Sequence, residues 1–297
     1  MTRSSLLIAF ISRHRLSVYV FIAFLWSWAW WIPATLAFKG AIALPVSWLP
    51  LLMIGGPGPS IAAIALTFAL DGMGGLKSLL RKFLIWRVNF AWYLFALITP
   101  SALLVCAMAI YTLRGGGLGR IDWANWPMLL FAIALALPFG PICEELGWRG
   151  YLLPGLQRSY SPLLSGVILG AVWTLWHTPL FWLPGGAAIS GPVVTVSAAL
   201  WYLAYLIGWS ILFTWMYNNT RGSVLLAVLL HGSLNAGSAL TLFPDLPFST
   251  RRSLLFLTII PLAAGIAVLL FGSKRPPKRR DEDRLSLHAQ REKESAR

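Results

Sequence analysis

Long stretches without a charged side chain are the feature that most constrains this sequence. Several of them run for about 20 residues, the length that an α-helix needs to cross the hydrocarbon core of a bilayer. Hydrophobic residues make up 58% of the chain and charged residues only 11%, against roughly 25% charged in an ordinary soluble domain. The sequence therefore predicts an all-α, polytopic transmembrane helical bundle. It excludes a disordered chain and argues against a soluble globular enzyme.

We expect about eight membrane-spanning helices, separated by segments rich in Gly, Pro, Asn, Asp or charge. One such break is expected over residues 71–83, which read DGMGGLKSLLRKF. The expected spans are residues 17–38, 49–70, 90–112, 127–143, 162–183, 193–216, 222–243 and 253–272.

The net charge of +14 does not indicate a nucleic-acid partner. The basic residues are scattered between apolar runs or lie in residues 273–297, and no compact basic face is interleaved with aromatic residues. The tail begins KRPPKRR, a composition that can contact anionic lipid heads. If the N-terminus is cytoplasmic, ten Lys and Arg residues before the tail fall on the cytoplasmic side and five on the other. The positive-inside rule thus predicts that both termini are cytoplasmic.

Two adjacent glutamates, Glu144 and Glu145, close the apolar run PMLLFAIALALPFGPIC. A carboxylate at membrane depth costs several kcal/mol, so such groups usually face a cavity and serve a function. The alternative is a purely structural ion pair, because Glu145 and Arg149 stand four residues apart on a helix. The two glutamates are rotated by about 100° and cannot face the same way. We expect the prolines and the glycine before them to break the span, with a new helix that begins near Pro141 and holds both glutamates in its first turn.

Two histidines, His177 and His231, fall inside predicted spans. A lone buried histidine is more often a satisfied core residue than a catalyst, but two of them in spans beside a paired-glutamate segment favour a functional site. His231 and Asn235 share one helix face. An asparagine amide can donate hydrogen bonds to an oxyanion, although its alternative role is to hold packed spans together.

Three motifs in apolar segments now carry a family resemblance. They are Glu144-Glu145-Leu-Gly-Trp-Arg149, Trp173-Thr-Leu-Trp-His177 and His231-Gly-Ser-Leu-Asn235. In this order they resemble EExxxR, FxxxH and HxxxN of the CPBP intramembrane proteases, which include CAAX prenyl endopeptidases of the Rce type and bacteriocin-processing, Abi-like relatives. Trp173 departs from the family pattern, since it stands at the phenylalanine position. The resemblance covers roughly residues 125–240.

The resemblance implies a division of the chain and a set of roles. The parts are N-terminal transmembrane helices (1–124), a CPBP-like protease core (125–240), a last transmembrane helix (241–272) and a basic, disordered cytoplasmic tail (273–297). Glu144 would activate water with help from His177. His231 and Asn235 would stabilise the oxyanion, and Glu145 with Arg149 would hold the first helix turn in place.

The cofactor is left open between two mechanisms. Glu144, His177 and His231 could bind Zn²⁺ and leave a position for water. A metal-free mechanism, in which glutamate activates the water, is preferred because the adjacent glutamates face apart. The sequence lacks the HExxH motif that a site-two metalloprotease would need.

The expected partners are membrane lipids and a peptide or lipidated-protein substrate, either a prenylated CAAX-like tail or a bacteriocin-type peptide. The 18 Arg against 6 Lys favour a bacterial plasma membrane as the location. Two alternatives stay open at this point. One is a non-catalytic membrane scaffold or immunity protein, and the other is a proton-coupled transporter, which also uses intramembrane Glu, His and Arg residues.

Overall fold

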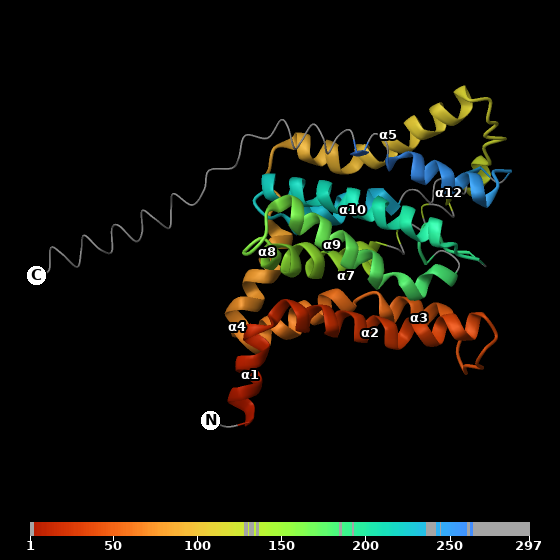
Figure 1. Cartoon of the computed structure of the whole chain (residues 1–297). Helices are drawn as coiled ribbons and strands as arrows, with labels where there is room; N and C mark the ends of the chain where they lie inside the picture. Colours follow the sequence, from red (N-terminus) through yellow and green to blue (C-terminus); the bar gives the residue numbers. More distant parts are fainter. Residues whose placement is uncertain are drawn as a thin grey trace, which may run out of the picture. The chain divides into compact units, whose positions relative to one another are not determined.

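A computed structural model describes residues 3–127, 130, 134, 137–183, 186–191, 193–235, 242, 243, 245–259, 262 and 263. These residues form helices and no strand, which confirms the predicted all-α bundle (Figure 1). The first helices are α1 (Arg3–Arg13), α2 (Arg15–Phe38), α3 (Trp48–Gly55), α4 (Gly58–Arg81) and α5 (Phe90–Leu113). The later helices are α7 (Cys143–Gly147), α8 (Leu153–Leu156), α9 (Pro162–Trp176), α10 (Val196–Asn219), α11 (Val224–Leu234) and α12 (Phe248–Leu257).

Four helical segments among the described residues are long and apolar enough to cross a membrane, as judged by length and composition. They are Arg15–Phe38, Trp48–Leu84, Phe90–Leu113 and Val196–Asn219. Each contains most of one predicted span, but the predicted count of eight is not confirmed. The helices found within the predicted spans 162–183 and 222–243 are shorter, with 15 residues in α9 and 11 in α11.

The predicted break over residues 71–83 is a kink between two helical segments rather than a loop. Helix α4 continues through this segment to Arg81 and bends at Gly72, whose backbone has φ 64° and ψ −161°. Only glycine adopts this conformation at little cost, so the glycine-rich sequence encodes a kink in the helix.

The largest fully buried side chains of the bundle are tryptophans. Trp31, Trp148, Trp173, Trp176 and Trp209 are almost completely buried. An indole nitrogen in a core usually needs an acceptor, and some of these side chains join helices in this way, whereas Nε1 of Trp209 has no hydrogen-bond partner among the described residues. Trp31 donates to the carbonyl of Leu52, for example, at 2.9 Å.

Glycines let the helices around this interior approach closely. Helix α4 packs against α7, and α9 packs against α10. A Cβ on Gly147 of α7 would overlap the carbonyl group of Pro59 in α4. A Cβ on Gly170 of α9 would lie 2.6 Å from Cα of Ile207 in α10. These contacts fix the position of α7 against the N-terminal helices.

The helices that carry the two histidines begin at serine caps. The Ser161 hydroxyl accepts a hydrogen bond from the amide of Leu164 at the start of α9, and Ser223 accepts one from Leu226 at the start of α11. Such caps satisfy amides that lack an intrahelical partner. The Ser223 hydroxyl also donates to the carbonyl of Ile85 at 2.7 Å, which ties α11 to the segment between α4 and α5.

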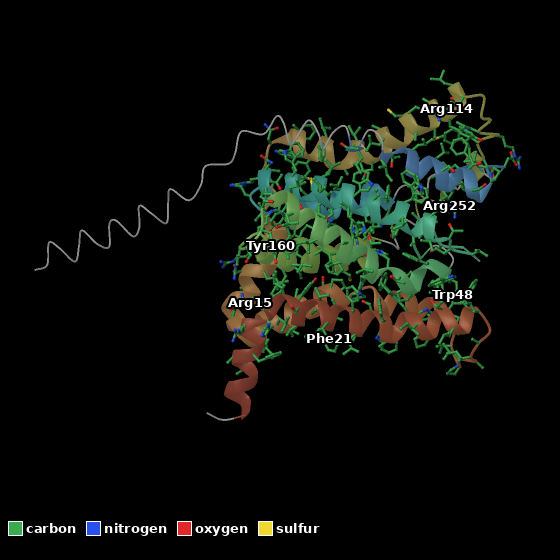
Figure 2. The ribbon with its side chains drawn as sticks, in the orientation of Figure 1. Arg15, Phe21, Trp48, Arg114, Tyr160 and Arg252 are labelled. Atoms are coloured by element: carbon green, nitrogen blue, oxygen red, sulfur yellow. The ribbon has the colours of Figure 1, made fainter. Side chains whose placement is uncertain are left out.

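Charged side chains gather at the two ends of the bundle, and apolar ones line its outside. In Figure 2, Arg15 and Tyr160 lie at one end and Arg114 and Arg252 at the opposite end. Phe21 points outward from the flank of α2 and is 65% exposed. This is the pattern of a bundle surrounded by lipid, with its charges at the two interfaces.

Parts of three predicted spans, 127–143, 222–243 and 253–272, lie outside the described residues. The whole predicted tail, 273–297, with its KRPPKRR start, lies outside them as well.

Candidate active site

Glu144 lies in α7, which connects two π-helical turns, Pro138–Ile142 and Trp148–Leu152. We expected the prolines to break the span and a new helix to begin near Pro141. The chain instead stays helical and widens into a π-turn, since proline lacks the amide hydrogen of the α-helical ladder. Both glutamates lie in the first turn of α7, as predicted. A π-turn of this kind changes the direction in which the following side chains project, and such turns are frequent at functional sites.

The carboxylate of Glu144 is held by two tryptophans. Its Oε2 accepts a hydrogen bond from Nε1 of Trp173 at 2.8 Å and another from Nε1 of Trp148 at 3.3 Å. Glu144 is only 6% exposed, and it has no ion-pair partner in the part of the chain that the structure describes. The group is thus an oriented, buried carboxylate whose charge no arginine or lysine neutralises directly.

Glu145 faces away from Glu144, as the rotation of about 100° between neighbours requires. Nη1 of Arg149 donates to both of its oxygens, at 2.7 and 2.9 Å, which confirms the predicted i,i+4 pair. Nδ1 of His231 lies 2.8 Å from Oε1 of the same carboxylate. An ionised carboxylate only accepts hydrogen bonds, so Nδ1 of His231 carries the hydrogen in this contact.

Aromatic rings surround the guanidinium group of Arg149. Its Cζ atom lies 3.9 Å from the ring centroid of Phe213 and 4.6 Å from that of Trp173. Nε and Nη2 have no hydrogen-bond partner among the described residues, and the side chain is fully buried. The cation–π contacts partly compensate for this burial. They connect the segment after α7 to α9 and α10.

His177 caps the C-terminus of α9. Its Nδ1 lies 2.8 Å from the carbonyl oxygen of Trp173, an acceptor, so Nδ1 is the protonated nitrogen and Nε2 remains for a water or a substrate. The ring packs edge-on against Trp176 and Tyr202, at centroid distances of 4.9 and 6.0 Å. Trp173 connects His177 to Glu144 and His231, since it contacts all three side chains.

Asn235 caps the C-terminus of α11 and is exposed. Its Nδ2 lies 3.8 Å from the point that a Cβ on Gly140 would occupy, and Oε1 of Glu144 lies at the same distance from that point. The amide donor of Asn235 and the second oxygen of Glu144 therefore border one small space beside Gly140.

The structure brings together all four residues that the motifs single out, and Trp173 is the neighbour that most of them share. It bonds to Glu144 through its indole and to His177 through its carbonyl, and its ring lies 5.2 Å from that of His231. Its aromatic position in the second motif was visible in the sequence, but its hydrogen bond to Glu144 was not predicted. Three further neighbours were missed: Gly140 and Phe213 lie outside the motifs, and Trp148 stands at a variable position of the first motif.

The proposed Zn²⁺ ligands do not fit a metal. Among the described residues, no group of three His, Cys, Asp or Glu side chains is placed to hold a metal ion. The alternative zinc set of Glu144, His177 and His231 is therefore not supported, and we derive no step through a metal.

The segment that contains this site is similar to known proteins. Residues 125–237 match the model described as type II CAAX prenyl endopeptidase, Rce1-like. Over 150 residues the chain is 29% identical to CAAX prenyl protease 2 of Methanococcus maripaludis, an alignment that covers 49% of this chain and 50% of the relative. The chain thus spans about half the length of the curated relative that it matches. The resemblance seen in the three motifs is confirmed, because residues 125–237, which contain all of them, match the Rce1-like CAAX prenyl endopeptidase family.

Proposed function

We propose that the protein is an intramembrane endopeptidase that hydrolyses a peptide bond in a membrane-associated substrate. The observation that carries this proposal is the buried carboxylate of Glu144, which lies near His177 and shares a small space with Asn235. Placing such a group at membrane depth is costly, which favours a catalytic role over a structural one. The family match supports the same reaction class.

In the proposed mechanism, Glu144 is the general base. A water molecule gives a proton to this carboxylate while its oxygen attacks the carbonyl carbon of the substrate, which forms a tetrahedral oxyanion. His177 helps to hold the water through Nε2, the ring nitrogen that its bond to Trp173 leaves available. When the C–N bond breaks, the proton on Glu144 passes to the leaving amine, and the carboxylate is regenerated.

His231 and Asn235 are proposed to stabilise the oxyanion. The side-chain amide of Asn235 can donate directly, and fixed donors in a site with little water stabilise developing charge strongly. Nδ1 of His231 donates to Glu145, so Nε2 can donate to the oxyanion when the ring is an imidazolium. Glu145 lies between Arg149 and His231 and has a supporting role, since it fixes the ring that would face the substrate.

The substrate is proposed to be a peptide or lipidated protein held at the membrane, with a prenylated CAAX-like tail or a bacteriocin-type peptide as the two candidate classes. We place the protein in a bacterial plasma membrane with both termini in the cytoplasm. The separation of Arg15 from Arg114 and Arg252 to opposite ends of the bundle agrees with their assignment to opposite sides of the membrane (Figure 2).

Purified protein in liposomes tests the function directly. It is incubated with matched peptides that differ only in whether a cysteine near the C-terminus is prenylated, together with bacteriocin-leader peptides, and the products are identified by mass spectrometry. We expect cleavage at a single bond in the membrane-bound peptides. A preparation that binds these peptides and cuts none of them would contradict the endopeptidase and favour the scaffold reading.

Chelation is expected to leave this activity unchanged. The side chains of Glu144, His177 and His231 are not placed to hold a metal. The rate of cleavage after treatment with EDTA or 1,10-phenanthroline should therefore stay within about twofold of the untreated rate, which corresponds to a few tenths of a kcal/mol in the activation free energy. The measurement is the initial rate before and after dialysis against chelator. Loss of the activity, followed by recovery on addition of Zn²⁺ alone, would show that this part of the proposal is wrong.

A further inference from the structure

The two oxygens of Glu144 have different surroundings. Oε2 accepts from the indoles of Trp173 and Trp148, which come from different segments and are both almost completely buried. Hydrogen bonds from two N–H donors occupy the lone pairs of that oxygen and stabilise its negative charge. Oε2 is therefore unsuited to receiving a proton from water.

Oε1 faces the space beside Gly140. Within 4 Å of the point that a Cβ on Gly140 would occupy, the nearest described groups outside the backbone of that helix are Oε1 of Glu144 and Nδ2 of Asn235. One is an acceptor and the other a donor. A water molecule between them would donate to Oε1 and accept from Nδ2, so both of its polar functions would be used.

We propose that Trp148 and Trp173 are positioning residues, which hold Oε2 of Glu144 so that Oε1 receives the proton of a water bound beside Gly140. This inference rests on the proposed function, because it names the oxygen and the space that the hydrolysis uses. The step is balanced: one proton moves from water to Oε1, the water oxygen bonds to the substrate carbonyl carbon, and the proton later moves to the leaving nitrogen.

A substitution at Trp173 can test the positioning role separately from packing. The family pattern has phenylalanine at this place, which offers an aromatic ring without an N–H donor. In this chain the ring of Trp173 also lies against Arg149, at 4.6 Å, and against His231, at 5.2 Å. Trp173→Phe keeps a ring for both contacts and removes the hydrogen bond to Glu144, so it isolates the positioning effect.

Trp173→Phe is expected to lower kcat by about 10- to 100-fold with KM nearly unchanged. The loss of a hydrogen bond to a charged group changes an equilibrium constant by about that factor. Trp148→Phe should have a smaller effect, since its bond is longer, at 3.3 Å against 2.8 Å. Trp31→Phe is the matched control. It removes an equally buried indole donor, whose acceptor is the carbonyl of Leu52, and should leave kcat unchanged.

A readout that does not need turnover keeps this test separate from that of the function. In 15N–1H spectra of protein labelled at its tryptophan indoles, the peaks of Trp173, Trp148 and Trp31 are assigned from the three phenylalanine variants. In Glu144→Gln the peaks of Trp173 and Trp148 should move and that of Trp31 should not. If neither peak moves, or if Trp173→Phe reduces kcat no more than Trp31→Phe does, the positioning role is overturned. If the parent protein cleaves nothing while both peaks move, the hydrogen bonds to Glu144 are established but their catalytic role, with the proposed function, is overturned.

Gly140→Ala tests the space itself. The added methyl would meet Glu144 and Asn235 at 3.8 Å, an ordinary contact distance, so the protein should fold. The methyl would narrow the space in which the water binds, and we expect kcat to fall by about 100-fold, the scale of a misplaced reactant. Gly74→Ala is the control, because a Cβ on Gly74 meets nothing within 4 Å. If Gly140→Ala keeps the kcat of the parent, the reacting water does not bind beside Gly140, and this part of the proposal is wrong.

Discussion

Replacing Glu144 with glutamine should reduce kcat by about 10³-fold while the protein remains folded, since general-base catalysis contributes roughly 10²–10⁴-fold. The side-chain volume is nearly unchanged. The amide oxygen can still accept from the indoles of Trp173 and Trp148, and the amide NH₂ group would then face the space beside Gly140. A donor in that place cannot take a proton from water. The measurement is the initial rate of peptide cleavage in liposomes at saturating substrate.

The matched control for this variant is Asp71→Asn, the same exchange of carboxylate for amide at an exposed site. Asp71 pairs with Arg15 at 3.6 Å and is 46% exposed, so its exchange should leave kcat unaffected. If Glu144→Gln keeps more than a tenth of the parental kcat, another group activates the water.

Removing the partner of Arg149 should produce the largest loss of stability. Glu145→Ala would leave a fully buried guanidinium whose remaining described contacts are the rings of Phe213 and Trp173. Breaking a buried ion pair from one side costs about 3–5 kcal/mol. We therefore expect a much lower melting temperature in detergent and a reduced yield of folded protein, together with loss of activity, because Nδ1 of His231 also loses its acceptor.

Two further variants distinguish a charge effect from a packing effect. Glu145→Leu combined with Arg149→Met removes both charges, and it should melt well above the single Glu145→Ala variant, since no unpaired charge remains. Asp245→Ala breaks an exposed pair with Arg120 and should change stability by less than about 1 kcal/mol. If the double variant is less stable than Glu145→Ala, the ion pair stabilises the folded protein by more than one unpaired buried charge destabilises it.

The contacts that followed from the sequence are mostly local. The pair of Glu145 with Arg149 and the divergence of Glu144 from Glu145 depend only on the 100° step of a helix, so a spacing was enough to predict them. The four long apolar helical segments also contain most of four predicted spans, because hydrophobic runs of about 20 residues are visible in the sequence.

The contacts that were missed join distant segments. The bond between Glu145 and His231 spans 86 positions, and the one between Glu144 and Trp173 spans 29. Both depend on how α7 packs against α9 and α11, which hydrophobic periodicity does not encode. The Gly-rich stretch after Asp71 marks a kink at Gly72, but the chain returns to a helix beyond it. The cost of glycine in a helix, about 1 kcal/mol each, is small enough for packing to override.

The close approach of Gly147 to Pro59 matters for anyone seeking a minimal catalytic fragment. The helices that pack against the segment of Glu144 precede the family match. Helix α4 contacts Gly147, and the ring of Tyr19 in α2 lies edge-on to that of Trp148, with a centroid distance of 5.9 Å. A polypeptide trimmed to residues 125–237 would expose this indole to solvent or lipid. Removing residues 1–124 therefore removes the contacts that support the segment of Glu144, although none of the three motifs is touched.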